Sequence, residues 1–166
     1  MAELRRTGSL EIAQDLAFHA RQWRATRLLW LALLAIMAAA VLGLFGGGPL
    51  AWSQAGSPGA ALWIDYDRVV RFGRATRVVV HARPDAAGMI RVSMDRTWLD
   101  AFQVQRVMPQ PVRVGAGEAA VEYQFESEES GPAAISFDLL PRAHWTVGGR
   151  MQAGGVAIRF DQLILP

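Results

Sequence analysis

The chain has 166 residues, a length that suits one compact domain with an appended segment. It contains no cysteine, which excludes a disulfide framework and a thiolate metal site. All 17 basic residues are arginine and 15 residues are acidic, so the formal net charge is only +2. This small charge gives no whole-chain indication of nucleic-acid binding.

Residues 1–27 form a polar arm, predicted to be cytoplasmic and amphipathic. Ser9 suits a helix N-cap, and Glu11 and Asp15 follow early, where the helix dipole favours acidic groups. In one interpretation the arm lies on the inner leaflet, with Arg24 and Arg27 at anionic headgroups. In the other, the arm continues the next helix into the cytosol. The residues leave both interpretations open.

Residues 28–49 are predicted to be a transmembrane helix. The first eighteen of them carry no charge. At 1.5 Å per residue, these eighteen cover roughly 27 Å, close to the hydrocarbon thickness of a bilayer. The Gly46-Gly47-Gly48-Pro49 stretch should end the helix. Trp30 and Trp52 bracket the run at the depths where indole rings favour the headgroup layer.

A cleaved signal peptide is the alternative to an anchor, and a buried core helix is a poorer third choice. Ser53-Gln54-Ala55 resembles a small-x-small cleavage site. However, twenty-seven residues precede the apolar run, which is long for a charged leader, and the run exceeds a usual signal core. We therefore favour an uncleaved anchor.

The arginines predict the orientation of this anchor. Only Arg68 and later arginines follow the span, whereas five lie before it: Arg5, Arg6, Arg21, Arg24 and Arg27. The positive-inside rule then places the N-terminus in the cytoplasm and the rest beyond the membrane. The predicted location is a bacterial inner membrane with a periplasmic C-terminal domain.

Small residues recur every fourth position along the predicted span, at Ala35, Ala39, Gly43 and Gly47. Residues four apart lie on one face of a helix, so these four would form a ridge. Such a ridge lets the backbone of a second membrane helix approach closely. The sequence therefore predicts helix pairing, with another membrane protein or with a second copy.

Residues 62–166 are predicted to be an extracytoplasmic β domain, joined through a linker at 50–61. About seven short runs alternate apolar and polar residues, with turn residues between them. The runs around 77–83 and 90–95 are predicted to form a hairpin across Pro84–Gly88, and 96–101 a single helical turn. The fold class is therefore mainly β: one N-terminal transmembrane α-helix followed by an antiparallel immunoglobulin-like β-sandwich. A small barrel is the alternative.

Few residues of the β domain suggest chemistry. Asp65 and Asp67 are two apart and share a strand face, but a solvated face explains them best. His81 is expected to be a strand-face residue, and His144 a loop residue beside Trp145. Arginines recur at 68, 71, 74 and 77; on one strand this spacing alternates faces, so solvated arginines are expected, and contact of some of them with outer-leaflet phosphates is the alternative. No catalytic motif is recognisable, so no enzyme activity and no cofactor are predicted.

Several blocks of the sequence resemble a family of small uncharacterised bacterial single-pass membrane proteins. They are Gln22-Trp23-Arg24 with Arg27 and Trp30, LGLFGGGPL at 42–50, and LWIDYDRVVRFGRATRVVV at 62–80. The resemblance covers most of the chain and implies an accessory role beside YetF-like membrane proteins. It supplies no functional residues.

The expected function is therefore a non-enzymatic accessory or scaffolding role, in which one helix pairs with a polytopic membrane protein and presents a periplasmic β-sandwich. Two alternatives stay open. One is a membrane-tethered solute binder or small enzyme, with polar groups converging around Asp65, Asp67, His144 and Trp145. The other is a homo-oligomeric envelope protein. No nucleic-acid partner is expected.

Overall fold

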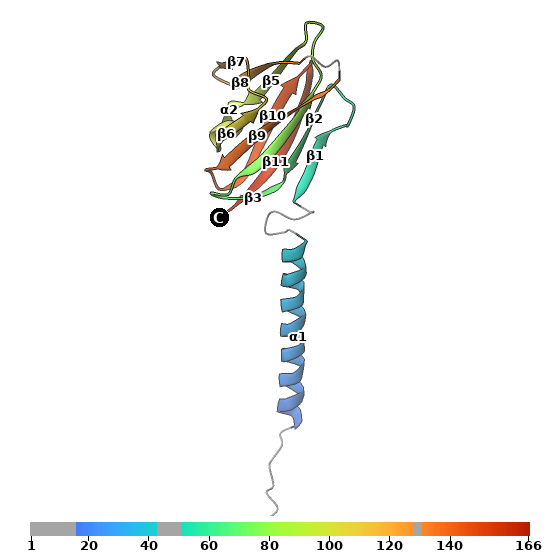
Figure 1. Cartoon of the computed structure of the whole chain (residues 1–166). Coiled ribbons are helices and arrows are strands. Elements are labelled where there is room, and N and C mark those ends of the chain that lie inside the picture. Colours follow the sequence, from blue (N-terminus) through green and yellow to red (C-terminus); the bar gives the residue numbers. More distant parts are fainter. Residues whose placement is uncertain (1–15, 43–50, 128–130) are drawn as a thin grey trace, which may run out of the picture. The chain divides into compact units, whose positions relative to one another are not determined.

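The computed structural model describes residues 16–42, 51–127 and 131–166 (Figure 1). They fall into two compact units that divide after Ala38, the first helical and the second containing the β domain. The helix, α1, spans Leu16–Val41. It contains most of the predicted transmembrane residues and also the second half of the predicted arm, so residues 16–27 continue the apolar helix. The predicted span from 43 to 49 lies outside the described residues.

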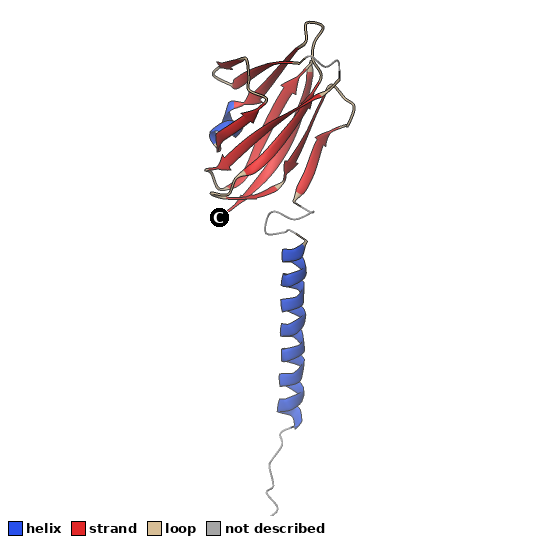
Figure 2. Cartoon of the chain, viewed as in Figure 1, coloured by secondary structure: helices blue, strands red, loops and turns tan. Residues whose placement is uncertain are grey.

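The β domain is a sandwich of two sheets, shown as red arrows in Figure 2. Sheet A has five antiparallel strands in the order β1-β2-β4-β9-β6. Its strands are β1 (Trp52–Gly56), β2 (Leu62–Asp67), β4 (Thr76–Ala82), β9 (Ala133–Pro141) and β6 (Phe102–Met108). The mainly β fold with an N-terminal helix is therefore confirmed, and the structure has two separate sheets where the alternative was a small barrel.

Sheet B has six strands in the order β3-β11-β10-β5-β8-β7. The β3–β11 pair is parallel and the other pairs are antiparallel. The strands are β3 (Val69–Arg71), β11 (Val156–Leu165), β10 (Trp145–Ala153), β5 (Met89–Asp95), β8 (Ala120–Glu126) and β7 (Arg113–Ala116). The described residues thus contain eleven strands rather than about seven, and an immunoglobulin-like topology is not confirmed.

The core lies between the sheets and follows from the alternating pattern. Every second residue is buried along β2, β4, β9 and β11. Because successive side chains of a strand point to opposite faces, this alternation puts one apolar row of each strand inside. Aromatic rings meet in the centre, where Tyr123 and Phe125 both pack edge-on against Phe137.

A short helix, α2 (Arg96–Asp100), connects β5 of sheet B to β6 of sheet A, as predicted from the sequence. The carboxylate of Asp95 caps it by accepting a hydrogen bond from the Thr97 amide at 2.8 Å. The helix buries the Trp98 ring, which packs against Phe102 and Phe160 at centroid distances of 5.0 and 5.2 Å.

Two local predictions are wrong. The predicted hairpin of residues 77–83 and 90–95 does not exist, because β4 pairs with β2 and β9 while β5 pairs with β8 and β10. Alternation identifies a strand but not its partner. The predicted linker is also partly a strand: β1 pairs with β2 from Trp52↔Asp67 to Gly56↔Trp63. The small and polar residues of β1 show no apolar alternation, so the sequence did not indicate this edge strand.

Candidate functional site

The first candidate surface is α1. The segment Gln22–Val41 is long and apolar enough to cross a membrane, with a mean hydropathy of 1.7. In residues 22–42, every side chain is exposed except that of Ala39, which is half-buried. An apolar helix surface of this extent requires lipid or another protein to cover it.

The predicted membrane-interface residues fall on two separate elements. Arg24, Arg27 and Trp30 lie on α1, where the Arg27 guanidinium sits 5.4 Å from the centroid of the Trp23 ring. Trp52, in contrast, begins β1 and belongs to the β domain. Its side chain is 58% exposed.

The predicted small-residue ridge is described only in part. Ala35 and Ala39 lie one turn apart on α1, so they share a helix face. Gly43 and Gly47 lie outside the described residues. Ala35 is flanked along the chain by the larger exposed side chains of Leu34 and Ile36, and Ala39 by Ala38 and Ala40. These two alanines are the described part of the predicted ridge, and we call them the α1 strip.

A second candidate is a polar cluster on the outer face of sheet A. The Asp65 carboxylate lies 3.0 Å from His81 Nε2 and accepts a hydrogen bond from Gln54 Nε2 at 3.0 Å. The His81 ring also stacks on Trp63 with centroids 4.6 Å apart. Sequence reasoning placed Asp65 and His81 on strand faces but missed their contact, because the contact depends on the pairing of β2 with β4.

The other residues suspected of forming a polar pocket do not join this cluster. Asp67 accepts a hydrogen bond from the Thr76 hydroxyl at 3.1 Å. His144 instead stacks on Phe72, with centroids 4.4 Å apart, and Trp145 begins β10 in sheet B. Asp65 and Asp67 thus lie on β2 of sheet A, whereas His144 lies in the loop between β9 and β10 and Trp145 is in sheet B. Among the described residues, no group of three His, Asp or Glu side chains is arranged to hold a metal ion.

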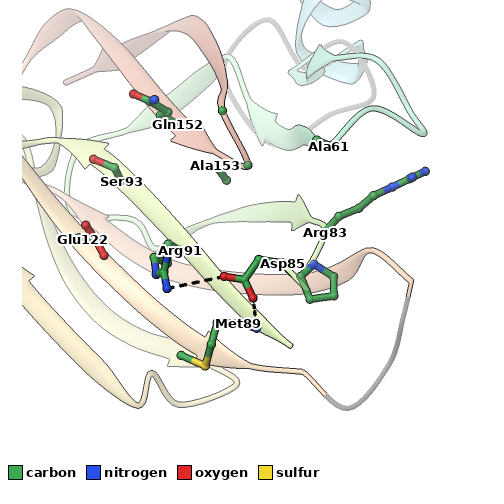
Figure 3. Close-up of a pocket in the computed structure, with 12 residues that line it drawn as sticks. Ala61, Arg83, Asp85, Met89, Arg91, Ser93, Glu122, Gln152 and Ala153 are labelled. Carbon is green, nitrogen blue, oxygen red and sulfur yellow. Dashed lines mark hydrogen bonds and ion pairs between the residues drawn. The ribbon is translucent and has the colours of Figure 1, made fainter. Parts of the chain in front are cut away.

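The third candidate is an open cleft of about 700 Å³, which we call the distal cleft (Figure 3). It lies where β5 and β10 diverge, since these strands pair only at Met94↔Met151 and Ser93↔Gln152. The β1–β2 turn, the end of β4 and the β10–β11 turn complete it. Its polar and charged lining residues are Arg83, Asp85, Arg91, Ser93, Glu122 and Gln152.

The charged groups of the distal cleft are held in place by one another and by the backbone. Asp85 accepts hydrogen bonds from the amides of Ala87 (2.9 Å) and Met89 (3.0 Å) and lies 3.6 Å from Arg91. The two backbone hydrogen bonds, with a smaller contribution from Arg91, lower the pKa of Asp85. Figure 3 shows Asp85 and Arg91 facing each other.

Sequence reasoning did not identify the distal cleft. Its lining comes from five places in the chain, including Ala61, Glu122 and Gly154. No spacing of residues along the sequence marks such a set. The chemistry that it offers is the binding of a polar molecule, because guanidinium, carboxylate and amide groups face one opening.

The comparisons with known proteins add no family to this picture. No protein-family model matches the chain, and no curated protein matches it.

Proposed function

We propose that the chain is a single-pass inner-membrane protein without catalytic activity, whose α1 anchors a periplasmic β-sandwich beside a polytopic membrane protein. The observation that supports this most is the exposed apolar surface of α1 over Gln22–Val41. Burying apolar side chains is worth about 25 cal/mol per Å² of surface, so leaving a whole helix in water would be costly. Lipid would cover the apolar side chains along the whole of Gln22–Val41.

The orientation with the N-terminus in the cytoplasm depends on charge. Arg21, Arg24 and Arg27 lie at the N-terminal part of the apolar helix, and the first arginine after it is Arg68. Arginine close to a membrane helix is retained on the cytoplasmic side. The β domain then lies outside the cytoplasm, where a chain without cysteine has no thiol to oxidise.

Helix pairing is the proposed mode of action. Ala35 and Ala39 offer the close approach that membrane helices use when they associate through dispersion contacts. As the partner we propose a YetF-like membrane protein, on the sequence resemblance alone. Self-association through the same strip is the competing outcome. The partner, in either case, would be identified by crosslinking in native membranes followed by mass spectrometry.

The paired polar groups of the β domain favour a structural role over a catalytic one. Asp65 is engaged by His81 and Gln54, and Asp85 by Arg91 and two amides. Groups held in this way stabilise the fold without requiring a substrate. No cofactor is needed for the proposed role.

The distal cleft favours a second candidate function, a membrane-tethered solute binder. A cleft of about 700 Å³ with two arginines, Arg83 and Arg91, and two acids, Asp85 and Glu122, in its lining suits a small polar solute. Thermal unfolding of the full chain with a panel of small carboxylates and phosphates tests this. A stabilisation that Arg91→Gln abolishes would support solute binding, whereas no shift with any compound would contradict it.

The anchor is tested by alkaline carbonate extraction together with cysteine labelling. Because the chain has no cysteine, one can be introduced at Thr7 or at Ser57 without background. We expect the full chain to stay in the membrane pellet, with Ser57→Cys labelled by an impermeant maleimide in spheroplasts and Thr7→Cys labelled only after lysis. A soluble mature chain that begins near residue 56 would contradict the anchor.

A further inference from the structure

We propose that one end of the β-sandwich docks on the bilayer surface, with its arginines on anionic phospholipid headgroups and its aromatic rings in the interfacial layer. We call this the basal end, the end at which β1 begins and β11 finishes. It carries three exposed aromatic side chains, Trp52, Phe72 and Trp145, and three exposed arginines, Arg68, Arg71 and Arg74. The proposal rests on the membrane anchor proposed above.

Backbone hydrogen bonds gather the segments of the basal end. The Arg68 amide donates to the Ala51 carbonyl at 2.6 Å, and the Leu163 amide donates to the Arg68 carbonyl at 2.7 Å. The Phe72 amide donates to the Leu165 carbonyl at 2.7 Å. Within the β domain, β3, the start of β1 and the C-terminus therefore lie at the same end (Figure 1).

The aromatic side chains of this end are unusually exposed. Trp145 is 73% exposed, Trp52 58% and Phe72 44%. Single exposed apolar residues are ordinary, but a group of large aromatic residues at one end indicates a binding surface. Tryptophan in particular favours the headgroup layer of a bilayer, because its ring is apolar and its N–H can stay hydrated.

Trp145 also adopts a strained backbone conformation. Its φ of 76° lies in the left-handed region, which residues other than glycine and asparagine rarely adopt. The strand pair β10–β11 begins at this residue, opposite Ile164. Strained residues of this kind concentrate at functional sites, where the surrounding structure holds them. In this conformation the Trp145 ring is exposed.

The arginines do not alternate along one strand as the sequence suggested. β2 ends at Asp67, β3 covers only Val69–Arg71, and a turn follows in which the Arg74 amide donates to the Arg71 carbonyl. All three guanidinium-bearing side chains are exposed at this end. None takes part in an ion pair with a carboxylate of the described residues, so they are available for phosphate groups.

The chain itself restricts what this end can reach. Only residues 43–50 separate Leu42, next to the end of α1, from Ala51. Nine residue steps span at most about 31 Å when fully extended. Once α1 is anchored, this tether keeps the bilayer surface at a high effective concentration for the basal end. A lipid surface is therefore the occupant that charge, aromatic residues and tether length together favour.

The test uses the full chain in lipid nanodiscs with a single nitroxide label. Ala75→Cys places the label in the exposed loop before β4 at the basal end, and Ser57→Cys places a control label in the β1–β2 turn at the other end. The readout is accessibility to oxygen, which partitions into lipid, relative to a water-soluble nickel chelate. In discs containing phosphatidylglycerol we expect a severalfold higher ratio at 75 than at 57.

Two sets of variants sharpen the test. Trp145→Gly removes the exposed ring while relieving the strain of the left-handed conformation, so it should fold normally and still lower the ratio at 75. Arg68→Gln with Arg71→Gln should lower it as well. Arg150→Gln with Arg159→Gln removes the same charge from exposed positions in the middle of β10 and β11 and should leave it unchanged.

The outcomes separate this proposal from the anchor. A chain that remains in the carbonate pellet but whose label at 75 is as water-accessible as that at 57 would overturn docking alone. Extraction of the chain by carbonate would overturn the anchor and docking together. A label at 75 that is shielded in native membranes but not in lipid nanodiscs would assign the basal end to a protein partner and overturn the lipid proposal.

Discussion

At the residue scale, Gln162 shows how a single polar side chain ties the sandwich together. It is completely buried on β11. Its amide oxygen accepts a hydrogen bond from Trp98 Nε1 at 3.0 Å, and its amide nitrogen donates to the Asp67 carbonyl at 2.9 Å. The side chain thus links α2, the end of β2 and sheet B. Buried polar groups are tolerated in a core when they are paired in this way.

We predict that Gln162→Leu destabilises the β domain by about 1–3 kcal/mol, because it leaves the Trp98 indole N–H and the Asp67 carbonyl without partners. Urea denaturation of the variant measures the effect. Gln152→Leu, at an exposed position of neighbouring β10, is the matched control and should change stability little. Equal midpoints for the two variants would contradict the role given to Gln162.

Asp85 provides a pH-dependent prediction. Because backbone hydrogen bonds lower its pKa from the ordinary value of 3.8, its ionised form stabilises the fold above that value. This stabilisation is lost as the pH falls through the lowered pKa. We expect Asp85→Asn to lower the melting temperature at neutral pH and the difference from wild type to vanish in strong acid. A pH-independent difference, or one also seen for Glu118→Gln, would contradict this.

At the element scale, the strands were easier to predict than their pairing. The alternation in β2, β4 and β9 correctly separates buried from outward-facing residues. The predicted β4–β5 hairpin fails because the chain crosses between the sheets after Ala82. Edge strands such as β1 and β7 are short and contain no buried residue, so they carry little hydrophobic signal.

The α1 strip yields a prediction about partner binding. Replacing Ala35 and Ala39 by leucine fills the face that would receive a second helix, so co-purification of a membrane partner should fall severalfold. Ala40→Leu introduces one leucine more than a quarter turn away from Ala39 and serves as the control for added side-chain bulk. Quantitative mass spectrometry after mild detergent extraction measures both. Equal partner recovery for the two variants would rule out the strip as the interface.

At the scale of the whole molecule, the chain consists of two units that differ in whether their apolar side chains are buried. Over residues 22–41 α1 exposes apolar side chains, whereas the β domain buries its own in one core between Leu62 and Ile164. The two ends of the sandwich also differ: the basal end carries exposed aromatic residues and arginines, and the opposite end carries the distal cleft.

We therefore predict that residues 51–166 fold without α1. The expected result is a single cooperative thermal transition with the near-ultraviolet circular dichroism of buried Trp98, because all the core contacts lie within this segment. A segment that starts at residue 57 should be less stable, since it lacks β1 and its pairing with β2. Failure of the 51–166 segment to fold would mean that α1 contributes to the β domain.

The sequence by itself determined the features that depend on local pattern. An uncharged run predicts an apolar helix, alternation predicts strands and their buried faces, and the order of the segments predicts a helix followed by a sandwich. These follow because helix and strand periods, and the length needed to cross a bilayer, are properties of neighbouring residues.

Only the tertiary structure decided which residues meet. Four features join residues that are far apart in the chain: the Asp65–His81 contact, the Gln162–Trp98 hydrogen bond, the distal cleft and the basal end. Strand order and register create them, and many strand orders satisfy the same alternating pattern. The candidate sites therefore could not be read from spacing, because the physical forces that select one strand order act across the whole core.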